Sequence, residues 1–137
     1  MGASYIHECD KCGYTFHTSG SWEFYRNREG KLIKFGHPIP ISEEAKTLGI
    51  KGLYGEMYCY ICDKVRRIIL AEFKNPPNDS ISMWMGRCEP EEKYKKEGAI
   101  KCTKCGNENL ILEMEKEGIF CPRCKEGKIK GRLEWIS

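Results

Sequence analysis

Short stretches of alternating apolar and polar residues recur along this chain, and a period of two is typical of strands with one buried face. The clearest lie in the C-terminal third, where NLILEME (after its first residues) and KIKGRLEWI alternate. Two further apolar stretches flank a break at residues 75–79, which contains two adjacent prolines. The predicted strands are residues 66–73, 81–85, 109–115 and 128–136. The pattern therefore predicts a β-rich protein with little helix.

The first half of the chain carries one hairpin signal and one helix signal. Residues 22–35 (WEFYRNREGKLIKF) predict a β-hairpin that turns at 27–30. Residues 42–49 predict a short helix, because Ser42 can cap its start and two glutamates follow in the first turn. Gly49 can end this helix.

Nine cysteines add chemistry to this pattern, and eight of them form four Cys-x-x-Cys pairs. In a chain without an evident signal peptide, paired cysteines favour metal over disulfides. The last two pairs are separated by fifteen residues, a spacing typical of zinc sites. Sequential pairing, first pair with second and third with fourth, is the simplest arrangement, and a cross-brace of alternating pairs is the alternative. The candidate metal ligands are Cys9, Cys12, Cys59, Cys62, Cys102, Cys105, Cys121 and Cys124.

The donor set indicates which metal these sites suit. Four thiolates at about 2.3 Å complete the tetrahedral coordination of zinc and leave no open position, so such a site stabilises a fold without activating water. We expect two Zn²⁺ ions, with iron in one or both sites as the alternative. Two four-thiolate zinc sites each contribute −2, so the formal charge of +3 becomes 3 − 4 = −1. A near-neutral protein has no bulk attraction for nucleic acid.

Three of the cysteine knuckles carry a family resemblance. Residues 102–106 (CTKCG) with 121–124 (CPRC) resemble the zinc-ribbon superfamily, and residues 9–14 (CDKCGY) are similar to the first knuckle of a rubredoxin-like fold. The resemblance implies short antiparallel strands that extend from two knuckles around one metal ion. The expected fold class is a small β-rich, metal-stabilised protein made of two tandem zinc-ribbon-like modules with short helices.

The predicted modules are unequal in length. Residues 1–88 form an N-terminal module with a long insertion at 13–58, residues 89–98 form a linker, and residues 99–137 form a C-terminal zinc ribbon. The linker, EPEEKYKKEG, has the composition of a short helical spacer, and a solvated, flexible stretch is the alternative. A small core needs additional stabilisation, such as a bound metal ion. Because residues 99–137 carry two of the cysteine pairs, we expect them to fold alone around one zinc ion. The role of residues 36–58 is left open.

Several functional patterns have a plain structural explanation beside them. Trp22, Phe24 and Tyr25 interleave with basic residues, as in proteins that stack single-stranded bases, but a hairpin with one packed face gives the same pattern. His7 could replace a cysteine ligand near the first knuckle. Cys88 could be a nucleophile, although a packed or incidental thiol is the simpler interpretation.

We therefore expect a zinc-binding adaptor or accessory subunit that mediates protein–protein contacts in a larger complex in the cytoplasm. The alternatives are a zinc ribbon that binds RNA or DNA and a rubredoxin-like iron electron carrier. We expect no enzymatic activity, since the chain shows no phosphate-binding loop, acid–base constellation or open metal site. The sequence indicates no membrane span, because no apolar run approaches the length of about 18 residues that a span needs. It also identifies no small-molecule substrate.

Overall fold

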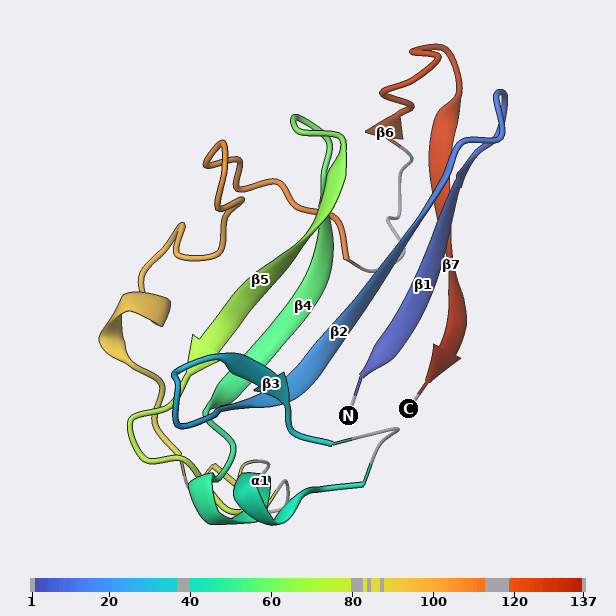
Figure 1. Ribbon diagram of the computed structural model, residues 1–137. Coiled ribbons are helices and arrows are strands. Elements are labelled where there is room, and N and C mark those ends of the chain that lie inside the picture. The colour runs from blue at the N-terminus through green and yellow to red at the C-terminus, as the bar shows by residue number, and fades with distance from the viewer. Residues whose placement is uncertain are drawn as a thin grey trace.

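One curved antiparallel sheet dominates the fold (Figure 1). The computed structural model describes residues 2–36, 40–79, 83, 85–86, 88–112 and 119–136. The elements within these ranges are β1 (Ala3–Cys9), β2 (Thr15–Arg26), β3 (Leu32–Lys34), α1 (Glu43–Leu48), β4 (Gly52–Cys59), β5 (Lys64–Glu72), the 3-10 turn η1 (Glu92–Tyr94), β6 (Ile119–Phe120) and β7 (Lys128–Ile136). The expectation of a small β-rich protein with little helix is confirmed.

The sheet joins the two ends of the chain. Its strand order among the described residues is β5-β4-β2-β1-β7-β6, with β3 also paired to β2. β7 lies antiparallel to β1, with Cys9 opposite Ile129 and Ala3 opposite Ile136. Strands from before and after the predicted linker therefore share one sheet, which differs from the expected arrangement of two tandem modules.

The hairpin turn and the first helix lie where they are predicted, although β2 begins at Thr15, seven residues before the predicted start of the hairpin. β2 and β3 pair across a turn at Asn27, whose side-chain oxygen accepts hydrogen bonds at 2.9 Å from the amides of Glu29 and Lys31. Ser42 Oγ accepts a hydrogen bond of 3.1 Å from the Ala45 amide and caps α1. These local predictions are confirmed because side-chain-to-backbone bonds within a few residues decide both structures.

β4 is a strand that the alternating pattern did not reveal. It lies between β2 and β5 in the sheet and is mostly buried along its whole length. A strand that is buried on both faces does not alternate, so a search for a period of two passes over it. Residues 36–58, whose role the sequence left open, contribute α1 and most of this inner strand.

Two of the predicted strands lie partly outside the described residues. Of the strand predicted at 81–85, only Met83 and Met85 are described, and of the one at 109–115 the described part ends at 112. Within that part, Ile111 pairs with Tyr58 of β4 through two backbone hydrogen bonds of 2.9 and 3.0 Å. The segment after the third knuckle is thereby fixed to the end of β4.

The predicted linker is a strap that packs along β5. The amide of Lys74 donates to the carbonyl of Glu89, and the amide of Glu91 donates to the carbonyl of Glu72, at 2.8 and 2.7 Å. Only η1 is helical in this stretch among the described residues. The Glu89 carbonyl, which would accept the first bond of a helix in this stretch, accepts from Lys74 instead, so the helical part of the expected spacer is reduced to η1 among the described residues.

Buried side chains form separate clusters at the two ends of the sheet. Tyr25, Phe35, Ala45, Ile50, Phe73 and Met83 pack together near α1. Cys9, Phe16, Tyr58, Ile111, Cys121 and Ile129 pack together near the cysteine knuckles. Within the described ranges, no helix is long and apolar enough to cross a membrane.

Candidate metal centres

The eight paired cysteines come together in two groups of four among the described residues. Centre A consists of Cys9, Cys12, Cys121 and Cys124, and centre B consists of Cys59, Cys62, Cys102 and Cys105. In each group the sulfur atoms all lie within 4.8 Å of one another. The first Cys-x-x-Cys pair thus joins the fourth and the second joins the third, so the sequential pairing expected from the spacing is wrong, and so is the alternating alternative.

Strand pairing explains this nested arrangement. The first pair lies at the turn from β1 to β2, and the fourth lies at the turn from β6 to β7. Because β1 pairs with β7, these two turns meet. The second pair lies at the turn from β4 to β5, at the same end of the sheet (Figure 1). Both centres therefore lie at one end of the molecule, and each takes one pair from either side of the strap at 89–98.

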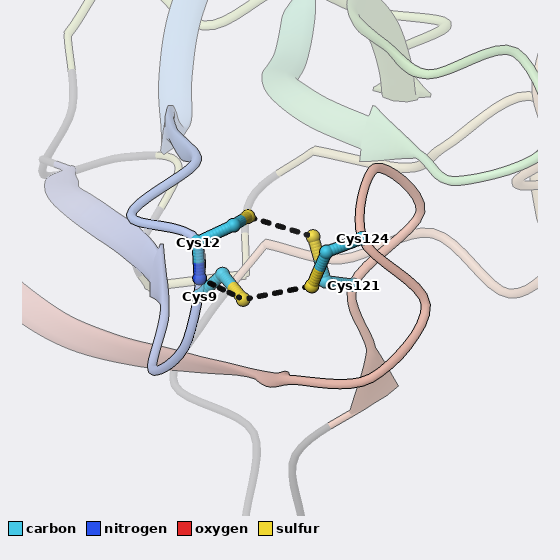
Figure 2. Close-up of side chains that lie close together, drawn as sticks. All are labelled: Cys9, Cys12, Cys121 and Cys124. Carbon is cyan, nitrogen blue, oxygen red and sulfur yellow. Dashed lines mark hydrogen bonds between the residues drawn. The ribbon is translucent and has the colours of Figure 1, made fainter.

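Centre A has the dimensions of a tetrahedral thiolate site (Figure 2). The sulfur atoms of Cys9 and Cys124 are 3.6 Å apart, and those of Cys12 and Cys121 are 3.7 Å apart. A tetrahedral site with metal–sulfur bonds of about 2.3 Å has sulfur–sulfur distances of about 3.8 Å. The four residues therefore fit one zinc or iron ion without rearrangement of the knuckles.

Centre B has matching dimensions and a neighbouring cation. Its Cys59–Cys105 and Cys62–Cys102 sulfur distances are 3.5 and 3.8 Å. The side-chain amide of Asn107 donates to Cys59 Sγ at 3.5 Å. The side chain of Cys62 raises the pKa of the neighbouring Arg66 guanidinium. These donors offset part of the negative charge that four thiolates bring to one ion.

Every knuckle ends on a residue in the left-handed backbone region. The residue directly after the second cysteine has φ between 53° and 78° in all four cases: Gly13, Asp63, Gly106 and Lys125. This geometry lets backbone amides point at sulfur, as where the amides of Lys11 and Cys12 both lie 3.4 Å from Cys9 Sγ. Two of these positions hold glycine, which adopts positive φ without steric cost. Asp63 and Lys125 are not glycines, yet their backbones adopt the same left-handed conformation.

The thiols of each centre divide into acidic and weakly acidic members. Backbone amides, that of Cys105 for Cys102 and that of Gly127 for Cys124, lower the pKa of each of these two thiols to about 6. A backbone amide also lowers the pKa of Cys12 and of Cys105, but burial and bonds to neighbouring thiols outweigh it and raise both to about 12. Four thiolates cannot all form without a cation, so metal binding to each centre releases protons.

Asp63 connects the two centres and was not singled out from the sequence. Its carboxylate accepts hydrogen bonds from the hydroxyls of Tyr14 and Tyr58 at 2.8 and 2.6 Å. Arg123 Nε donates to its other oxygen at 2.8 Å. Burial raises the pKa of the Asp63 carboxyl, but these three donors outweigh burial and lower it. An aspartate in the position where two other knuckles have glycine was the signal that could have revealed it.

The other candidate residues lie outside both centres. His7 is buried, stacks on Phe16 with ring centroids 4.7 Å apart, and lies 2.8 Å from Thr18 Oγ1 through Nε2. Cys88 packs against the cluster near α1, and burial raises the pKa of its thiol. A raised pKa reduces thiolate content at neutral pH, so these surroundings do not activate Cys88 as a nucleophile.

Comparison with known proteins gives no relative: no family model, no curated protein and no solved structure matches the chain. The likeness to zinc ribbons therefore rests on three of the knuckles and on the two groups of cysteines that could each hold a metal ion. On that basis the chain carries two candidate metal-binding centres with four cysteines each.

Proposed function

We propose that this protein is a zinc-stabilised adaptor or accessory subunit that binds a protein partner and catalyses no reaction. The observation that carries the proposal is the composition of both centres. Each provides four cysteine sulfurs at tetrahedral distances, which saturates a zinc ion and leaves no position for substrate or water. Metal in such centres fixes the shape of the surface around it.

The second knuckle presents an apolar surface for such a partner. Its tip residues, Tyr60 and Ile61, are 39% and 60% exposed. Each of the other three tips, residues 10–11, 103–104 and 122–123, carries a charged residue. Burial of one isoleucine side chain in an interface is worth roughly 1.5–3 kcal/mol, so this tip is the part of the metal end best suited to protein contact.

The burial of the hairpin aromatics weakens the case for the nucleic-acid alternative. Trp22, Phe24 and Tyr25 are at most 7% exposed. Lys34 Nζ lies 3.7 Å from the centroid of the Trp22 ring and covers it. Single-strand binders need exposed aromatic faces on which bases stack. These three rings pack against protein, as a hairpin with one packed face predicts.

The surface at the second knuckle is tested by quantitative affinity purification from native cells after nuclease treatment. The baits are the full chain and two single variants, Ile61→Ser and Ile136→Ser. Ile136 is 68% exposed at the end of β7 far from the knuckles, so it is a matched control. We expect Ile61→Ser to lose a protein that both other baits retain. Equal capture by all three baits would contradict the proposal. So would a protein that is captured from untreated lysate but is lost after nuclease treatment.

A further inference from the structure

The bonds of Asp63 run from one centre to the knuckles of the other. Asp63 directly follows Cys62, a ligand residue of centre B. Two of its three donors belong to centre A: Tyr14 closes the first knuckle, and Arg123 lies between the two cysteines of the fourth. One side chain of centre B thus holds both knuckles of centre A.

The donors are themselves fixed to the metal knuckles. The Tyr14 carbonyl accepts a hydrogen bond of 2.8 Å from the Cys9 amide, and the Arg123 amide donates to Cys121 Sγ at 3.3 Å. The Arg123 guanidinium also lies over the Tyr14 ring, 4.5 Å from its centroid. If centre A loses its metal and its knuckles separate, Asp63 loses two of its three partners.

The third donor ties Asp63 to the core between the centres. Tyr58 is fully buried and stacks on Phe16, with ring centroids 3.8 Å apart. Its backbone pairs with Ile111, which follows the third knuckle of centre B. The cluster that contains Tyr58 also contains Cys9 and Cys121 of centre A. A displacement of Asp63 therefore reaches both pairs of centre B through Tyr58.

We propose that Asp63 is a positioning residue that couples the two metal centres, so that metal binding at either one strengthens metal binding at the other. The inference stands apart from the adaptor proposal, because it concerns the centres and requires no partner. Coupling of this kind is reciprocal between two binding sites and is typically worth 5- to 150-fold in affinity.

Asp63→Asn is the most direct variant. Asparagine keeps the size of the side chain and is tolerated at a φ of 53°, so the knuckle conformation is preserved. The change removes the charge that Arg123 recognises. Glu56→Gln is the matched control, because Glu56 pairs with Arg67 at 3.2 Å within the sheet and its side chain is 32% exposed, against 30% for Asp63.

The measurement is a chelator titration of the full chain loaded with 113Cd, in which each four-thiolate centre gives its own NMR resonance. We expect the two resonances to disappear together in the unmodified protein and in Glu56→Gln. In Asp63→Asn we expect the chelator concentrations that remove them to separate by about tenfold. Independent loss of the two resonances in the unmodified protein, or joint loss in Asp63→Asn, would overturn the proposal.

A second measurement compares centre B with and without centre A. In a Cys12→Ser, Cys124→Ser variant only centre B keeps four thiols, and we expect its cadmium affinity to fall about tenfold from that in the full protein. With Asp63→Asn added, the same two serine substitutions should change that affinity little. Equal losses in both backgrounds would show that Asp63 carries no coupling.

Discussion

At the scale of single residues, backbone conformation at the knuckles was only half predictable. Glycine at positions 13 and 106 is typical of positive φ, because glycine adopts this backbone region without steric cost. Asp63 and Lys125 adopt the same region, although their sequence gives no such signal. Closure of the Cys-x-x-Cys turn imposes the conformation there, and the side chain of Asp63 then becomes available for bonds to both centres.

Lys125→Gly should therefore stabilise the metal-loaded protein. Lys125 has φ of 60°, where a side chain crowds the backbone, and glycine removes that strain. We expect the free energy of unfolding to rise by about 0.5–1 kcal/mol, measured by urea denaturation. Lys128→Gly, in the extended strand β7, is the control and should lower stability. A loss of stability in Lys125→Gly would contradict the strain argument.

His7 should remain neutral at pH values where an ordinary histidine is charged. Thr18 donates its hydroxyl proton to the Leu112 carbonyl, so Thr18 Oγ1 must accept from His7, which places the imidazole proton on Nε2. Burial lowers the pKa of His7 below 6.5. The unfolded chain then binds a proton that the folded chain does not, so stability is lost as pH falls through 6.5 towards the folded pKa. NMR titration of the imidazole nitrogens checks this; a pKa of 6.5 or above would be inconsistent with it.

At the scale of elements, strands were predictable and their partners were not. Alternation identified the strand at 128–136 and turn chemistry identified the hairpin, because both depend on neighbouring residues. The pairing of β7 with β1 joins residues more than a hundred positions apart, and no local pattern specifies it. The fifteen-residue spacing between the last two cysteine pairs is also typical of a single zinc ribbon. Spacing alone therefore indicated that these two pairs share one centre, although the structure places them in different centres.

A fragment of residues 97–137 tests this pairing. The sequence alone predicts that residues 99–137, which this fragment contains, fold around one zinc ion, but their two cysteine pairs belong to different centres. It also lacks β1, the neighbour of β7. We now expect its NMR spectrum to show poor dispersion even with excess zinc. A dispersed spectrum that collapses on chelation would support the sequential pairing instead.

At the scale of the whole molecule, metal binding and folding are closely linked. Cys9 and Cys121 are both candidate ligands and members of the buried cluster at the knuckle end. In the sequence, all four cysteines of centre B lie between the two pairs of centre A. Each centre therefore closes a loop of the chain, and the loop closed by centre B lies inside the one closed by centre A. Such closure allows a short chain with small apolar clusters to hold one shape.

Metal analysis of the natively isolated protein should find two zinc ions per chain. Eight cysteines in two groups of four require that ratio, and Cys88 belongs to neither group. Cys88→Ser should therefore keep both ions, as measured by elemental analysis on the same preparation. A single ion, or iron in place of zinc with a visible absorption band, would contradict the zinc assignment.

The nested grouping of cysteines is the central claim, and proton–cadmium correlation NMR on the full chain loaded with 113Cd tests it most directly. Each cadmium resonance correlates with the β-protons of the cysteines that bind it. We predict one resonance that correlates with Cys9, Cys12, Cys121 and Cys124, and a second that correlates with Cys59, Cys62, Cys102 and Cys105. A resonance that correlates Cys9 and Cys12 with Cys59 and Cys62 would contradict the structure described above.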